Sequence, residues 1–83
     1  MVDERPLGAE QCRAARALVG WSRSALSERC GVAASTLADF EAGKRAPYSR
    51  TLLDVRRALE EAGVQFIPAD GGGGPGVRLQ VHG

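Results

Sequence analysis

Four glycines divide most of the chain into short segments, and their spacing limits what it can fold into. Gly20, Gly31, Gly43 and Gly63 each follow a run of good helix formers. Glycine is the residue best suited to the left-handed position that ends a helix. We therefore expect several short helices joined by tight turns. Because 83 residues can build only one small core, these helices are expected to form a single domain.

Composition excludes several classes of protein. A hydrophobic share of 43% is enough for a core, and 11 basic against 10 acidic residues give a net charge of +1. The chain is therefore neither a polybasic tail nor an acidic disordered segment. No apolar run approaches the ~18 residues of a membrane helix, and the first residues lack the pattern of a signal peptide. We expect a cytoplasmic protein with no membrane partner.

The residues that carry metal or catalytic chemistry are scarce. Cys12 and Cys30 are too few for a disulfide scaffold and lack the spacing of a zinc or redox motif. His82 is the only histidine, so no nucleophile can be paired with a base. We predict no enzyme, no metal site and no cofactor. The two cysteines are interpreted as buried free thiols in preference to redox sensors.

The spacing of apolar residues predicts four helices. In residues 9 to 20, Arg13 and Arg16 fall on the solvent side. The apolar face of this segment contains Cys12, Ala15, Leu18 and Val19. Ser22 is predicted to cap a second helix and Ser49 a fourth, with a third over residues 34 to 42. The fourth helix has an apolar stripe of Leu52, Val55, Leu59 and Ala62.

After Gly63 the pattern changes from helix to strand. Two segments that favour strands flank a glycine-rich loop, and residues 77 to 81 alternate strictly between apolar and polar. An isolated hairpin is marginal in water, so its apolar residues should pack on the helices, pair with a second copy, or both. These candidate dimerisation residues are Phe66, Ile67, Val77, Leu79 and Val81.

Residues 22 to 43 contain the most informative pattern. A short helix, a turn with Gly31 and a second short helix with a small, polar start form a helix-turn-helix arrangement. The runs 20–32 and 35–47, ending in Phe-Glu-x-Gly-x-Arg-x-Pro, resemble the phage repressor and Cro-type family, also called the xenobiotic-response-element (XRE) family. The resemblance spans roughly residues 9 to 63. It implies a mainly α, lambda-repressor-like domain of four to five helices, here followed by a two-strand β-hairpin.

The resemblance also implies which residues contact double-stranded DNA. The positions facing base edges are Ala34, Ser35, Thr36 and Asp39. The positions near phosphates are Arg23, Lys44, Arg45 and Arg50. Asp39 only accepts hydrogen bonds and would favour the N4 amine of cytosine, whereas Ser35 would discriminate weakly. Trp21 and Phe40 are interpreted as core residues, and Arg56 and Arg57 as salt-bridged or solvated.

Two positions depart from the family pattern. Ala33 stands where many relatives have a serine or threonine that caps the third helix, and this absence typically costs ~1 kcal/mol. Ser27 replaces a common alanine at the contact between two helices. Its hydroxyl is expected to bond to a carbonyl one turn back.

These patterns give one functional hypothesis and one alternative. Residues 1–8 are expected to be an N-terminal arm, 9–63 the DNA-binding domain and 64–83 a dimerisation element. Members of the family are mostly bacterial or phage regulators, so the resemblance implies a homodimeric repressor of a pseudo-palindromic operator. The alternative is an antitoxin-like module that binds a protein partner and represses its own operon. Residues 43 to 57 carry five basic residues and one acidic residue, which favours DNA attraction there.

Overall fold

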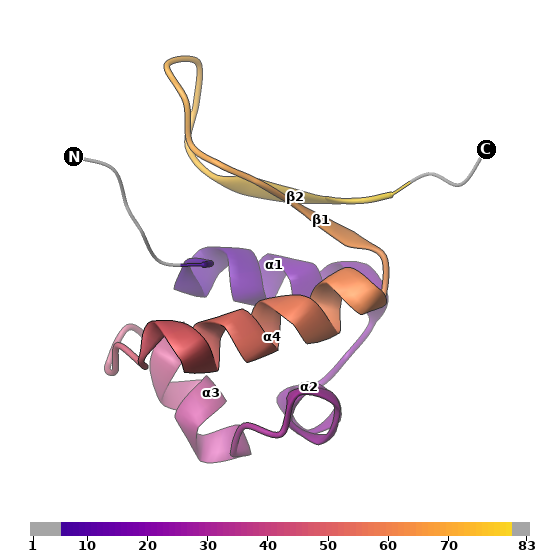
Figure 1. Cartoon of the computed structure of the whole chain (residues 1–83), viewed down its shortest axis with the longest axis vertical. Coiled ribbons are helices and arrows are strands. Elements are labelled where there is room, and N and C mark those ends of the chain that lie inside the picture. The colour runs from indigo at the N-terminus through magenta and orange to yellow at the C-terminus, as the bar shows by residue number, and fades with distance from the viewer. Residues whose placement is uncertain (1–5, 81–83) are drawn as a thin grey trace.

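A computed structural model of the chain describes residues 6–80, which form four helices followed by a two-stranded antiparallel sheet (Figure 1). The elements are α1 (Ala9–Val19), α2 (Arg23–Cys30), α3 (Ala34–Glu41), α4 (Ser49–Glu61), β1 (Val64–Ile67) and β2 (Gly76–Leu79). The predicted mainly α domain with a C-terminal hairpin is confirmed. Within the described residues, no helix is long and apolar enough to cross a membrane.

The elements are stacked in three layers. The hairpin packs against α1 and α4, while α2 and α3 lie on the other side of these two helices (Figure 1). The glycine-rich end of the hairpin projects away from the helices. Consequently the hairpin and the predicted DNA-reading helix lie on opposite sides of the molecule.

Most of the predicted helix boundaries are confirmed. Gly20 and Gly31 have left-handed φ angles of 71° and 75° at the ends of α1 and α2, a conformation that a side chain would strain. The hydroxyl of Ser22 caps α2 by accepting the Ala25 N–H at 3.0 Å. The predicted cap at Ser49 is wrong, because α4 begins at that residue and no side chain caps it.

The core draws on every helix and on β1. Its buried members are Leu7, Cys12, Ala15, Leu26, Leu37, Phe40, Leu52, Val55, Ala58, Leu59, Val64 and Phe66. Phe40 is confirmed as a core residue, and Trp21 packs against the core from its edge. The prediction that Leu18 faces inward is wrong, since its side chain is exposed. Cys12 is buried and Cys30 half-buried, and both are free thiols.

The register of the hairpin decides which side chains meet the helices. Val64 pairs with Leu79 and Phe66 with Val77, and the burial of Val64 and Phe66 shows that this face lies against the helices. Ile67 lies on the opposite face, because successive side chains in a strand alternate. The last candidate dimerisation residue, Val81, lies outside the described residues.

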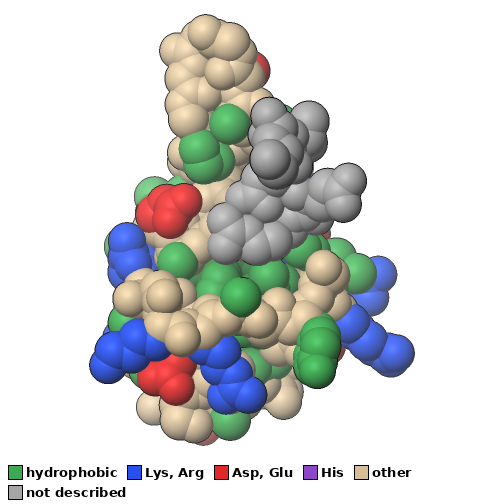
Figure 2. Space-filling model, turned by 90° about the vertical axis from the view of Figure 1, so that its left-hand side faces the viewer, with side chains coloured by type: hydrophobic (Ala, Val, Ile, Leu, Met, Phe, Trp, Pro, Cys, Tyr) green, Lys and Arg blue, Asp and Glu red, His purple; other side chains and the backbone are tan. Residues whose placement is uncertain are grey.

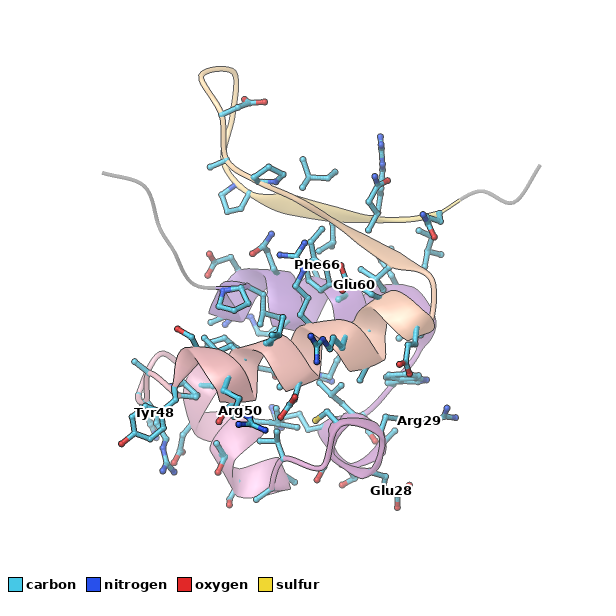
Figure 3. The ribbon with its side chains drawn as sticks, in the orientation of Figure 1. Glu28, Arg29, Tyr48, Arg50, Glu60 and Phe66 are labelled. Atoms are coloured by element: carbon cyan, nitrogen blue, oxygen red, sulfur yellow. The ribbon has the colours of Figure 1, made fainter. Side chains whose placement is uncertain are left out.

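Two polar side chains attach the hairpin to the helices. The Gln11 amide donates to the carbonyls of Ile67 and Gly76 at 3.3 and 3.1 Å. The Arg56 guanidinium lies over the Phe66 ring, 5.1 Å from its centroid, and forms an ion pair with Glu60 at 3.1 Å. Figure 3 shows Phe66 between the hairpin and the helices. Phe66 therefore packs on the helices of its own chain, and Arg56 is salt-bridged as predicted.

Candidate nucleic-acid interface

The turn between α2 and α3 is fixed by a hydrogen bond across it. The Ser27 hydroxyl donates to the Val32 carbonyl at 2.6 Å. The predicted partner, a carbonyl one turn back, is therefore wrong. Leu26 and Leu37 are both buried on the inner sides of the two helices, so the angle between α2 and α3 is set by packing as well as by this bond.

The C-terminal end of α3 is attached to α1 by a buried carboxylate. Glu41 is 2% exposed and accepts two hydrogen bonds from Arg16, at 2.8 Å from Nε and 2.7 Å from Nη2. The Cys12 thiol donates to the same carboxylate at 3.1 Å, and Arg13 donates to the Glu41 backbone carbonyl. The prediction that Arg16 lies on the solvent side is thus wrong: this cluster joins the predicted DNA-reading helix to the rest of the domain.

The protonation states in this cluster follow from its geometry. Burial by itself would raise the pKa of Glu41, but hydrogen bonds from Arg16 and Cys12 and the charges of Arg16 and Arg23 outweigh it and lower the pKa. Burial raises the pKa of the Cys12 thiol, and the neighbouring Glu41 carboxylate raises it further. The thiol therefore stays protonated and can donate its hydrogen bond, which supports the interpretation of Cys12 as an unreactive residue.

The candidate base-reading residues lie on the side of α3 away from the core. Ser35 is exposed, and Ala34, Thr36 and Asp39 are half-buried. Ser35 and Asp39 are four residues apart, so they lie on one face of the helix. Among the described residues the Asp39 carboxylate has neither a hydrogen-bond donor nor a basic partner within bonding distance. It is therefore available to accept a hydrogen bond from outside the chain.

The candidate phosphate contacts come from α2, from the loop after α3 and from α4. Arg23 begins α2, and one of its guanidinium nitrogens is 3.7 Å from a Glu41 carboxylate oxygen with half of its side chain exposed. Lys44 and Arg45 follow α3, and Arg50 lies in the first turn of α4; all three are exposed. Figure 2 shows basic side chains gathered over the helical part of the molecule, below the projecting hairpin. Basic side chains thus gather near the C-terminal end of α3 and at the start of α4.

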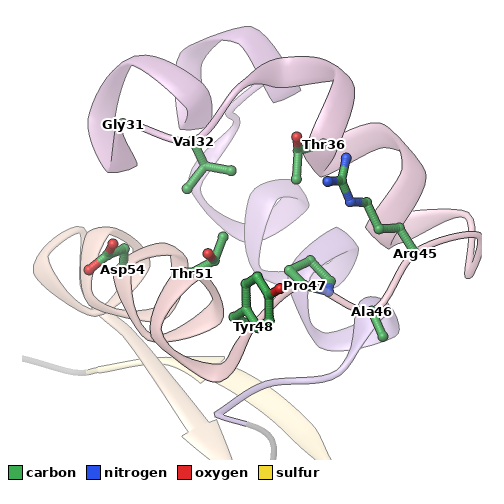
Figure 4. Close-up of a pocket in the computed structure, with 9 residues that line it drawn as sticks. All are labelled: Gly31, Val32, Thr36, Arg45, Ala46, Pro47, Tyr48, Thr51 and Asp54. Carbon is green, nitrogen blue, oxygen red and sulfur yellow. The ribbon is translucent and has the colours of Figure 1, made fainter.

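A surface pocket of about 570 Å³ separates α3 from the start of α4 (Figure 4). Thr36 and Arg45 lie at one end of the pocket and Asp54 lies at the other (Figure 4). Between them lie Thr51 and Tyr48, whose side chain is 87% exposed. The end near Arg45 is rich in hydrogen-bond donors and suits an anion, whereas Asp54 would repel one.

Two residues of this region were missed by sequence reasoning. Glu41 is part of the Phe-Glu-x-Gly run, yet nothing local to it indicates burial, because its partner Arg16 is 25 residues away. Tyr48 lines the pocket, and its position between Pro47 and Ser49, inside the basic segment 43–57, was the available signal.

The comparison with protein families agrees with this geometry. The family model described as Helix-turn-helix matches residues 13–63. The chain belongs to the helix-turn-helix family, in its XRE-type branch. This helix-turn-helix protein is thus a DNA-binding transcription regulator. The match ends at Gly63, although the core of this helix-turn-helix protein continues into Val64 and Phe66. No curated protein sequence matches the chain.

Proposed function

We propose that this regulator is a cytoplasmic repressor that binds a pseudo-palindromic operator as a homodimer. The observation that carries the proposal is the exposed face of α3 together with the basic residues near its C-terminal end, Arg23, Lys44 and Arg45. A major groove has a phosphate backbone along each edge. With α3 in the groove, these cations would therefore reach phosphates while the side chains of α3 meet the bases.

The proposed base contacts have distinct chemistry. Asp39 presents an acceptor without a partner among the described residues, so it favours the N4 amine of cytosine and disfavours the acceptor edge of guanine. Ser35 can donate or accept and adds little discrimination. Ala34 and Thr36 offer methyl groups that suit the C5-methyl group of thymine.

The proposed phosphate contacts include the pocket beside α3. Arg45 and the hydroxyls of Thr36 and Thr51 provide donors along its lining, and Arg50 is exposed in the first turn of α4 (Figure 3). Each contact of this kind releases counterions and makes binding sensitive to salt.

Selection of sites from random DNA, followed by fluorescence anisotropy on the selected site, tests the proposal. We expect Arg45→Ala to weaken binding to all sequences and to reduce the salt slope by about one. Asp39→Asn should instead change the preferred base at one position of each half-site. Arg57→Ala is the matched control, because Arg57 is exposed on α4 outside the proposed contacts. Equal losses for all three variants on selected and random DNA would refute the assignment.

The homodimer follows from the small size of the contact. One recognition helix reads only a few base pairs, and a second domain supplies a second half-site about 34 Å away on the same face of DNA. The C-terminal strands are the proposed dimerisation element. A selected site with two inverted half-sites, bound cooperatively by two chains, would support this; binding of one chain to one half-site would contradict it.

A further inference from the structure

The two strands of the hairpin are covered unequally by the helices. Val64 and Leu79 are direct cross-strand partners and so lie on the same face of the sheet. Val64 is nevertheless 3% exposed and Leu79 is 45% exposed. The helices therefore cover the inner face of β1 and leave the end of β2 open. Leu18, another exposed large apolar residue, lies in the last turn of α1, the helix on which β2 packs.

The outer edge of β2 also carries backbone groups without partners in the described chain. The Gln80 N–H donates to the Gly63 carbonyl at 2.8 Å, and in an antiparallel pair hydrogen-bonded and non-hydrogen-bonded residues alternate. It follows that Arg78 bonds to β1, whereas Val77 and Leu79 direct their N–H and C=O groups away from it. An exposed edge of this kind is a template for another strand.

We propose that the edge of β2 pairs antiparallel with β2 of a second copy, with Leu79 opposite Leu79 of the second copy. This inference rests on the proposed homodimer and names its contact surface. A second copy fits because an antiparallel pair of identical strands is related by a two-fold axis, so one edge serves both partners. The exposed Leu79 side chains then cover each other beside the new strand pair.

The positive charge of Arg78 on β2 favours one of the possible registers over the other. Among the described residues of β2, Val77 and Leu79 direct backbone groups outward and must form the hydrogen-bonded pairs. Leu79 can therefore lie opposite Leu79 or opposite Val77 of the second copy. The second register places Arg78 directly opposite Arg78 of the second copy, and like charges in that position are destabilising. The first register places Arg78 opposite Gln80 instead.

This pairing also orients the DNA-reading helices. The two-fold axis between neighbouring antiparallel strands is perpendicular to the sheet, so both sets of helices lie on the same face of the four-stranded sheet. In each copy α2 and α3 lie beyond α1 and α4, away from the hairpin (Figure 1). Both copies of α3 would therefore face the same side. The body of one chain measures 36 × 33 × 19 Å, which is comparable with the ~34 Å between half-sites.

The first experiment measures self-association of the full chain without DNA by sedimentation equilibrium. We expect Leu79→Lys to raise the dimer dissociation constant by about tenfold or more, because it replaces an apolar contact with two like charges. The matched control is Tyr48→Lys, which makes the same kind of change at a more exposed apolar residue far from β2. An equal effect of both variants, or no effect of Leu79→Lys, would overturn the proposal.

The second experiment tests the register by disulfide formation in a Cys30→Ala background. Residues in a hydrogen-bonded pair have Cα atoms ~5.5 Å apart, within disulfide range, so Leu79→Cys should give a covalent dimer under mild oxidation. Gln65→Cys, on β1, should not. A covalent dimer from Arg78→Cys alone would overturn the register. A dimer that binds two half-sites but does not cross-link at residue 79 would overturn this surface and leave the proposed function standing. A monomer that binds single half-sites would refute both.

Discussion

Helix α1 fixes two parts of the molecule by different chemistry. Toward α3 it uses charge, because Arg16 forms a bidentate ion pair with the buried carboxylate of Glu41. Toward the hairpin it uses a neutral amide, because Gln11 donates to two backbone carbonyls. One attachment positions α3, the proposed reading element, and the other positions the hairpin, the proposed dimer element.

The two attachments should fail differently. A buried ion pair contributes little net stability over apolar residues, but the loss of one partner leaves an uncompensated charge. A lost amide hydrogen bond costs only the desolvation of the groups left without a partner. The position of α3 should therefore depend steeply on single residues of the cluster, whereas the hairpin should tolerate the loss of Gln11 because Val64 and Phe66 also anchor it.

The largest effect is expected for Glu41→Gln. This change leaves the guanidinium of Arg16 largely buried without a counter-charge, and we expect the free energy of unfolding to fall by ~3–5 kcal/mol in urea titrations. Glu60→Gln is the control, because its ion pair with Arg56 is partly exposed and should contribute less than ~1 kcal/mol. The double variant Arg16→Met/Glu41→Leu should recover much of the loss. Similar small losses for Glu41→Gln and Glu60→Gln would show that the charged attachment of α3 does not depend steeply on a single residue.

Acid should weaken the charged attachment selectively. The pKa of Glu41 is lowered from its ordinary value of 4.5 in the folded chain. Its contribution to stability is therefore fully present above that value and is lost as pH falls through the lowered pKa. In urea titrations between pH 3 and 7, the free energy of unfolding should fall more steeply toward low pH for the natural chain than for Arg16→Met/Glu41→Leu. If the free energy of unfolding depends on pH in the same way for both chains, the Arg16–Glu41 cluster does not control the loss of stability in acid.

The neutral attachment is tested by Gln11→Glu. The carboxylate still accepts the Gly8 N–H, which Gln11 accepts at 2.8 Å, but it cannot donate to the hairpin carbonyls. At pH 7 we expect a loss of ~1–3 kcal/mol and faster amide exchange in the hairpin than in the helices. Gln65→Met is the control, since Gln65 bonds to Arg78 on the exposed face and should change stability by less than ~0.5 kcal/mol. Uniform exchange throughout the chain would indicate that Gln11 supports the whole domain.

The sequence predicts the elements well because their signals are local. Gly20 and Gly31 end helices through their own backbone conformation, and the hydroxyl of Ser22 caps the helix that follows it directly. The alternation of residues 77 to 81 likewise predicts a strand without reference to its neighbours. The family motif adds the order of the helices, so the fold follows from signals that each span a few residues.

The attachments could not be predicted, because they join residues far apart in the sequence. Arg16 and Glu41 are 25 residues apart and Gln11 and Gly76 are 65 apart, and no local pattern marks either pair. The same reason explains the wrong placement of Arg16, which has the spacing of a solvent-side residue on α1 until α3 packs against it. The candidate contact residues on α3 were accessible to sequence reasoning, whereas the cluster that positions them was not.

The smallest effect concerns the other end of α3. Glu41 fixes its C-terminal end, but no side chain caps its N-terminal end, where Ala33 occupies the capping position. Ala33→Ser supplies an oxygen that can accept an N–H of the first turn, so we expect the free energy of unfolding to rise by ~1 kcal/mol. Ala33→Val, which adds size without an acceptor, should give no increase. If urea titrations show no gain for serine, the first turn of α3 is already stabilised by other means, and the missing side-chain cap does not limit the stability of α3.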